Sequence, residues 1–278
     1  MSPTRPPLSP GPVAASGPQL PAGPFPGGAP VVGVLLAAGA GRRLGRGPKA
    51  LLSVDGTPQV VRMARALLRG GCDAVVVVAG AAGEKVRRVL DVMLRGTVEG
   101  RRVWIVMNPG WEAGLGSSFR TGIEAADRML APSGPSAGLI MVALVDQPDV
   151  DEAVVRCLLD SVSATASTTD GAAATTASTT AATSATATSA AAGVRVIAAG
   201  YPDAQGRVVR SHPVVFPRPW AREAAAQAAG DAAGRVWLRS HPEVVDVVDV
   251  GHLATGRDVD TPQDLHWLSH RTEADVRA

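Results

Sequence analysis

The sequence predicts an α/β fold in which a mostly parallel central sheet lies between two layers of helices. Short apolar runs alternate with stretches of helical spacing along the chain. The runs are apolar at nearly every position, which is typical of strands buried on both faces of a parallel sheet. With 278 residues, 46% of them hydrophobic, the chain is long enough to form one domain with a sizeable core.

The first half of the chain gives a regular alternation of strands and helices. Val31 to Leu36 is a continuous apolar run that ends in glycines, which predicts a strand followed by a tight loop. Pro58 to Leu68 has helical spacing, and Ala74 to Ala79 is rich in valine, so we expect a helix and a second strand. The pattern then predicts a helix over Glu84–Leu94, a strand over Val103–Met107, a helix over Ser117–Leu130 and a strand over Leu139–Val145.

Shorter elements follow in the second half. We predict strands over Val194–Ala199, Pro213–Phe216 and Val244–Val250, helices near Trp220–Ala229 and Asp231–Ser240, and a last helix from Pro262. The last helix has a clear start, because Thr261 can cap it and Asp264 lies near the positive end of its dipole. In sheets of this class ligands bind at the carboxyl ends of the strands, so the loops after strands should carry the site.

Two low-complexity segments lie at the start and in the middle of the chain. Residues 1–30 are rich in proline and glycine without periodicity, which predicts a disordered tail that buries too little apolar surface to fold. Residues 163–192 are alanine, serine and threonine apart from Asp170 and Gly171, and they have no apolar face. We interpret them as a flexible surface insertion. The predicted domain spans residues 31–270, followed by a short tail at 271–278.

Composition excludes several classes of function. The net charge is +2, and no cluster of basic residues forms the stripe that nucleic acid requires. Cys72 and Cys157 are too few and too apolar in setting for a disulfide framework or a zinc site. No apolar run reaches the roughly 18 residues of a membrane span, and the start lacks the pattern of a secretory signal. We therefore expect a cytoplasmic protein with no nucleic-acid or membrane partner.

The loop after the first strand has the composition of a phosphate-binding loop. The segment from Leu36 to Gly45 is rich in small residues, which expose consecutive backbone N–H groups to a ligand. Arg43 and Lys49 add positive charge. An ordinary tight turn is one alternative. A dinucleotide-binding fingerprint is another, but it needs its third glycine one residue earlier than Gly45, and the Gly-Lys-Ser/Thr ending of P-loop ATPases is absent.

Acidic residues at two distant places indicate a metal site. Asp146 ends the fourth predicted strand, where a carboxylate without a partner would be costly to bury. Mg²⁺ prefers oxygen ligands and takes one or two carboxylates, with substrate phosphates completing its shell. Asp258 and Asp260 near the end of the chain point to the same side of an extended segment. Turn or capping roles are the alternatives for both places.

These motifs resemble the MobA-like NTP transferase family. The family signature, Leu-Ala-x-Gly-x-x-x-Arg-Met-Gly and then Pro-Lys, is matched from Leu36 to Gly45 and at Pro48-Lys49. Gly41 stands where many members have serine, and Leu44 where methionine is usual. The resemblance extends from about residue 31 to about residue 268. It implies a Rossmann-like, three-layer α/β/α nucleotidyltransferase fold.

The resemblance also implies roles for these residues. The backbone of the phosphate loop would bind the nucleotide through Leu36, Ala37, Ala38, Gly39 and Gly41. Arg43 would contact the β- and γ-phosphates, and Lys49 would neutralise charge at the α-phosphate. Asp146, in its Asp-Gln-Pro turn, would be the principal Mg²⁺ ligand and is counted as catalytic with Arg43 and Lys49. Asp260, before Thr-Pro, would complete the metal site, with Asp258 as the alternative.

Two further segments resemble regions of the family that bind the base and the acceptor. The stretch from Asn108 to Ser118 is similar to a loop that lies over the nucleobase, which would place Gly116, Ser117 and Ser118 near the base. Helix capping is the alternative role of the two serines. His212 and Asp231 lie in motifs similar to acceptor segments, with Ser211 in place of a glycine and a Gly-Ala order reversed before Arg235. A purely structural role is the alternative for His212.

The chemistry implied is attack of an acceptor phosphate oxygen on the α-phosphorus of a nucleoside triphosphate, in line with departing pyrophosphate. Catalysis would depend on positioning and on charge stabilisation. The motifs look closest to the molybdenum cofactor cytidylyltransferases, which favours CTP, molybdopterin and delivery of the product to a molybdoenzyme. Guanylyl transfer and transfer to a sugar phosphate or another metabolite phosphate stay open. A nucleotide-binding regulator without turnover is the alternative from another class.

Overall fold

The computed structural model describes residues 29–170 and 194–268. Most of the predicted insertion at 163–192 and the predicted C-terminal tail lie outside the described residues. The predicted N-terminal tail also lies outside them, apart from residues 29 and 30. Helix α4 (Glu152–Asp170) extends into the start of the predicted insertion.

The sheet has seven strands in the order β5-β4-β1-β6-β8-β7-β9. Their bounds are β1 (Val31–Ala37), β4 (Ala74–Ala79), β5 (Val103–Met107), β6 (Leu139–Leu144), β7 (Val196–Pro202), β8 (Val208–Pro217) and β9 (Val245–Asp249). β1 runs parallel to β4 and β6, β4 to β5, and β7 to β9, whereas β8 runs antiparallel to β6 and β7. The prediction of a mostly parallel sheet is confirmed.

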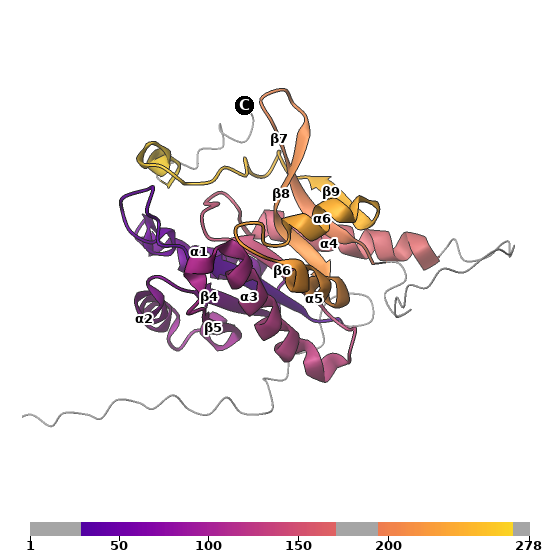
Figure 1. The fold of residues 1–278 in the computed structure, drawn as a ribbon, viewed down its shortest axis with the longest axis horizontal. Helices are drawn as coiled ribbons and strands as arrows, with labels where there is room; N and C mark the ends of the chain where they lie inside the picture. The colour runs from indigo at the N-terminus through magenta and orange to yellow at the C-terminus, as the bar shows by residue number, and fades with distance from the viewer. Residues whose placement is uncertain (1–28, 171–193, 269–278) are drawn as a thin grey trace, which may run out of the picture.

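Helices cover both faces of the sheet (Figure 1). α1 (Gln59–Gly70), α2 (Gly83–Leu94) and α4 pack against one face, and α3 (Leu115–Leu130), α5 (Arg218–Gln227) and α6 (Arg235–Ser240) pack against the other. Successive strand residues alternate between the two cores: Val77 belongs to the first, and Val76 and Val78 to the second. This arrangement explains why the strands are apolar at nearly every position, and it confirms the three-layer α/β/α fold.

Some elements differ from the sequence-based predictions. A short hairpin of β2 (Ser53–Val54) and β3 (Thr57–Pro58) was not predicted, and its turn places Asp55 and Gly56 at φ 49° and 77°. β8 begins well before the predicted Pro213, because Arg210, Ser211 and His212 interrupt its apolar pattern. The last predicted helix is the short 3-10 helix η7 (Pro262–Leu268). Within the described residues, no helix is long and apolar enough to cross a membrane.

The topology brings distant segments to one edge of the sheet. β1 and β6 are parallel neighbours with Leu36 paired to Leu144, so the loops that follow them lie side by side. The C-terminal segment joins them, since the Val259 N–H donates to the Asp146 carbonyl at 2.9 Å. Val259 also packs in a small apolar cluster with Leu44, Val54 and Leu268. Figure 1 shows this yellow end of the chain beside the indigo loops that follow β1.

Candidate active site

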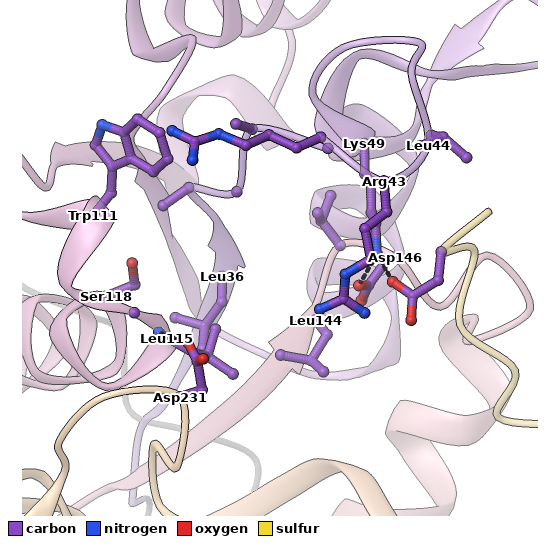
Figure 2. Close-up of a pocket in the computed structure, with 18 of the residues that line it drawn as sticks. Leu36, Arg43, Leu44, Lys49, Trp111, Leu115, Ser118, Leu144, Asp146 and Asp231 are labelled. Atoms are coloured by element: carbon purple, nitrogen blue, oxygen red, sulfur yellow. Dashed lines mark hydrogen bonds and ion pairs between the residues drawn. The ribbon is translucent and has the colours of Figure 1, made fainter. Parts of the chain in front are cut away.

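A cavity of about 700 Å³ opens at the carboxyl ends of β1 and β6. Its lining comes from the phosphate loop over residues 38–44, from the end of β6 over 144–146, and from five residues around the start of α3: Trp111, Glu112, Gly114, Leu115 and Ser118. Leu36, Lys49, Asp231 and Asp260 complete it. In Figure 2, Arg43, Lys49 and Asp146 lie on one side of the cavity, and Trp111 and Ser118 lie on the other.

The phosphate loop depends on glycine at one position in particular. Gly41 has φ +64°, and a Cβ there would lie 2.0 Å from the carbonyl oxygen of Gly47. An L-residue would therefore be strained and would also collide with backbone. A Cβ on Gly39 would meet nothing within 4 Å, although Gly39 lines the cavity. The loop thus approaches the cavity with bare backbone, as phosphate binding requires.

Lys49, Asp146 and Asp260 form one ion cluster. The Lys49 Nζ donates to Asp146 Oδ2 at 2.8 Å and also makes a short contact with Asp260 Oδ1. The lysine and Asp146 side chains are 17% and 22% exposed, against 46% for Asp260. Residues separated by most of the chain are therefore brought to one point, where two carboxylates face the same cation.

This cluster determines the charge of the lysine. Burial acts to lower the pKa of Lys49, but the charge of Asp146 and the hydrogen bonds to Asp146 and Asp260 outweigh it and raise the pKa above its usual value. Desolvation raises the pKa of Asp258 to about 6, and the charge of Asp146 adds to the shift. Of the two candidate aspartates, Asp260 lines the cavity and contacts Lys49, which favours it over Asp258.

Two segments of the cavity lining are joined by residues to which sequence reasoning gave no role. Arg42, next to the predicted Arg43, pairs with Glu112 at 3.2 Å, and its guanidinium carbon lies 5.7 Å from the centre of the Trp111 ring. Both side chains of the ion pair are largely exposed, so the pair itself contributes little stability. Trp111 and Glu112 lie within the segment that resembles the base loop, and that resemblance was the signal that could have identified them.

Asn108 organises the predicted base loop. Its Nδ2 donates to Ser117 Oγ at 2.9 Å and to Ser118 Oγ at 3.0 Å, and its Oδ1 accepts from the Gly110 N–H at 3.0 Å. The Ser117 hydroxyl contacts the carbonyls of Gly110 and Gly114, so it closes the loop. Ser118 lines the cavity.

The two predicted acceptor residues lie in different places. Asp231 lines the cavity, and its Oδ1 accepts from the Leu115 N–H at 3.4 Å. His212 does not line it, and its carbonyl accepts from the Tyr201 hydroxyl at 2.9 Å. Burial lowers the pKa of His212 to about 4, so the ring is neutral near pH 7.

The structure thus brings most of the predicted site residues to one cavity. Those in its lining are Leu36, Ala38, Gly39, Gly41, Arg43, Lys49, Ser118, Asp146, Asp231 and Asp260. Ala37, Gly116, Ser117 and His212 are outside the lining. Ala37 is buried in β1, and the Gly116 N–H donates to the Gly230 carbonyl at 2.7 Å, so both support the walls. Contact of each residue with a nucleotide stays a prediction.

Residues 33–245 match the family model of the MobA-like NTP transferase domain. The chain is 37% identical over 240 residues to a nicotine blue oxidoreductase of Paenarthrobacter nicotinovorans, covering 86% of this chain and 96% of that protein.

Two solved structures share the fold. A nucleotidyl transferase from Methanothermobacter has a TM-score of 0.57 at 19% identity, over 86% of this chain and 95% of the other. Rv0371c of Mycobacterium tuberculosis H37Rv, in complex with manganese, has a TM-score of 0.51 at 25% identity, over 86% and 97%. The solved structures share the fold, and the family match shows that the chain belongs to the MobA-like NTP transferase family.

Proposed function

We propose that this chain transfers the nucleotidyl group of a nucleoside triphosphate to a phosphorylated small molecule, with release of pyrophosphate and with a divalent cation as cofactor. The observation that carries the proposal is the cluster of Lys49, Asp146 and Asp260 at the open end of a glycine loop. Bare backbone N–H groups and fixed positive charge bind a triphosphate, and paired carboxylates bind the divalent cation that accompanies it.

The residues present fit a hard cation. Asp146 and Asp260 offer oxygen ligands that already share one positive partner. No group of three or more histidine, cysteine, aspartate or glutamate side chains in the described part of the chain is arranged to hold a metal. Two carboxylates, with phosphate oxygens completing the shell, are the usual Mg²⁺ arrangement. The manganese complex of Rv0371c supports a divalent cation, and we propose Mg²⁺ for this chain.

The chain's own residues would then position the reaction. N–H groups of the phosphate loop would bind the triphosphate, and Arg43, which points into the cavity in Figure 2, would contact its β- and γ-phosphates. Lys49 would neutralise charge at the α-phosphate as the acceptor oxygen forms its bond to phosphorus and the bond to pyrophosphate breaks. When bound at Asp146 and Asp260, the cation would supply further neutralisation of phosphate charge.

For the substrates we propose CTP and molybdopterin, with the product delivered to a molybdoenzyme. The support is the combination of Asp-Gln-Pro at Asp146, His-Pro at His212 and Asp-Val-Asp-Thr-Pro at Asp258. GTP with the same acceptor is the next candidate, followed by sugar phosphates and other metabolite phosphates.

A second candidate function comes from the relative named as an oxidoreductase. At 37% identity over nearly its whole length, that protein makes hydride transfer to an organic substrate a specific alternative. A glycine loop after a strand can hold the pyrophosphate of a dinucleotide as well as a triphosphate. The carboxylate pair beside Lys49 favours the transferase, because hydride transfer has no need of a metal at that point.

The deciding experiment incubates the purified chain with Mg²⁺ or Mn²⁺, each of the four nucleoside triphosphates, and molybdopterin or sugar phosphates. We expect pyrophosphate release that needs the cation and an acceptor and is fastest with CTP. Asp146→Asn removes one charge without a change of shape and should lower turnover at least about 100-fold. Asp91→Asn, on the exposed face of α2, is the matched control.

Parallel assays with reduced nicotinamide dinucleotides and an oxidised organic dye as the hydride acceptor test the second candidate. Oxidation of the dinucleotide without pyrophosphate release from any triphosphate would overturn the transferase. Tight triphosphate binding without any turnover would instead identify a regulator.

A further inference from the structure

Asp264 lies outside the cavity lining, but it holds the backbone of a cavity residue. A single oxygen, Asp264 Oδ2, accepts hydrogen bonds from the N–H of Asp260 at 3.0 Å, from the N–H of Thr261 at 2.7 Å and from the Thr261 hydroxyl at 2.8 Å. The two N–H groups are those on either side of the Asp260 Cα. The carboxylate of Asp264 therefore fixes the stretch of backbone from which the Asp260 side chain projects.

The residue before Asp260 is held as well. The Val259 N–H donates to the carbonyl of Asp146 at 2.9 Å, and the Val259 side chain is 1% exposed in its cluster with Leu44, Val54 and Leu268. The backbone is therefore held by hydrogen bonds on both sides of Asp260. Before it, Val259 is bonded to Asp146, and the N–H groups of Asp260 and of the residue after it are bonded to Asp264.

A capping role accounts for only part of this pattern. Thr261 precedes η7 and Asp264 is the third residue of that helix, so the bond from the Thr261 N–H is the usual one of a capping box. The bond from the Asp260 N–H reaches one residue further back than a capping box requires. The bonds of Asp264 therefore fall on the segment that carries the proposed metal ligand. Groups that hold a ligand's orientation contribute to metal affinity although they never touch the metal.

We propose that Asp264 is a positioning residue that holds the Asp260 carboxylate toward Asp146 and so sets the affinity for the divalent cation. The inference rests on the proposed function. Because the hydrogen bonds that hold Asp260 are made by the backbone, they can be tested without any ligand.

The first measurement is amide hydrogen exchange of the full chain without metal or nucleotide. Asp264→Ala should speed exchange at the Asp260 and Thr261 amides while the amide of Val259, bonded to Asp146, changes less. Asp264→Asn keeps the volume and one acceptor oxygen, so it should give an intermediate change. Gln263→Ala, at an exposed neighbouring residue, should leave these rates as in the wild type.

The second measurement is Mn²⁺ affinity in the presence of CTP, by electron paramagnetic resonance, with the Mn²⁺ concentration for half-maximal pyrophosphate release alongside it. Asp264→Ala should weaken Mn²⁺ about 10-fold. At saturating Mn²⁺ the kcat should recover to a large extent, because Asp264 contacts no reacting atom.

The outcomes separate the two claims. Unchanged exchange at Asp260 and Thr261, or unchanged Mn²⁺ affinity in a folded Asp264→Ala chain, overturns the positioning role. A wild-type chain that binds no Mn²⁺ with any triphosphate overturns the proposed function, and the exchange data then still decide whether Asp264 holds the segment. Equal loss of kcat at all Mn²⁺ concentrations would also contradict positioning.

Discussion

Lys49 serves as the counter-ion of both proposed metal ligands, so its removal has two effects. Lys49→Ala deletes the charge expected at the α-phosphate and leaves Asp146 and Asp260 without their shared partner. We expect kcat/KM for pyrophosphate release to fall about 100- to 1,000-fold, as for the loss of other groups that stabilise transition-state charge. The unfolding temperature should change little, because both carboxylates keep access to water.

Arg46→Ala is the matched control for Lys49, since Arg46 is an exposed cation of the same loop that is absent from the cavity lining. Steady-state kinetics and thermal unfolding of both variants check the prediction. A large loss of stability with unchanged kinetics would show that Lys49 has only a structural role.

The lowered pKa of His212 should make the stability of the protein depend on pH. Its pKa is about 4 in the folded chain, through burial, against a usual value of 6.5. Between these values the unfolded chain binds a proton that the folded chain does not, so the free energy of unfolding falls as the pH is lowered from 6.5 to 4. This group should account for up to about 3 kcal/mol of that fall.

Denaturant unfolding at several pH values compares the wild type with His212→Gln and with His252→Gln, the exposed control. The free energy of unfolding should depend less steeply on pH only in His212→Gln. Parallel slopes for the wild type and His212→Gln would show that the ring is not shielded from protonation.

The site residues were predictable from the sequence where the residue type fits a single chemical role. Gly39 and Asp146 lie in the loops after β1 and β6, and Lys49 lies further along the connection after β1. The structure places all three around one cavity. The bridge between Arg42 and Trp111 could not be predicted, because it depends on how two loops from different strands face each other.

At the scale of elements, the pairing of α3 with α5 depends on a buried charge. Arg218, 1% exposed, donates to Asp127 Oδ1 at 2.7 Å and to the carbonyl of Leu130 at 3.0 Å. Partial burial acts to raise the pKa of Asp127, but the hydrogen bonds from Arg222 and Arg218 outweigh it and lower the pKa. The carboxylate thus compensates a guanidinium that water does not reach.

Asp127→Ala should lower the free energy of unfolding by about 3 kcal/mol at pH 7, because it leaves a buried charge without its partner. The pKa of Asp127 is depressed, so its contribution is present above the usual value near 4 and is lost as acid protonates the carboxylate. The gap between wild type and variant should therefore narrow toward pH 3. Urea unfolding with Glu124→Ala, exposed on the same helix, provides the comparison, and equal stability of both variants would contradict the prediction.

Helices and strands were predictable from the sequence where their apolar patterns are long. β1, β4 and α1 lie within a few residues of their predicted bounds, because each buries a continuous apolar face. The first half of β8 was missed because Arg210 and Ser211 interrupt its apolar pattern. The hairpin of β2 and β3 was missed because two-residue strands have no periodicity to detect.

At the scale of the whole molecule, the C-terminal segment carries a site residue but no strand of the sheet. A chain ending at Ala254 would lose Asp260 and would expose the apolar surface that Val259 and Leu268 cover. We expect circular dichroism close to that of the full chain, an unfolding temperature lower by about 10 °C, and no detectable pyrophosphate release.

Asp260→Asn in the full chain is the matched variant for this truncation. It should lose turnover with almost no change in unfolding temperature. Retained turnover in the truncated chain would exclude the segment from the site.

The tie between Val259 and Asp146 also has a consequence for the order in which the protein becomes active during synthesis. The glycine loop leaves the ribosome well before the carboxylate that completes its ion cluster, because Asp260 lies 211 residues after Lys49. Under the proposed function, a nascent chain with its first parallel strands folded would catalyse no transfer until Asp260 had also been made.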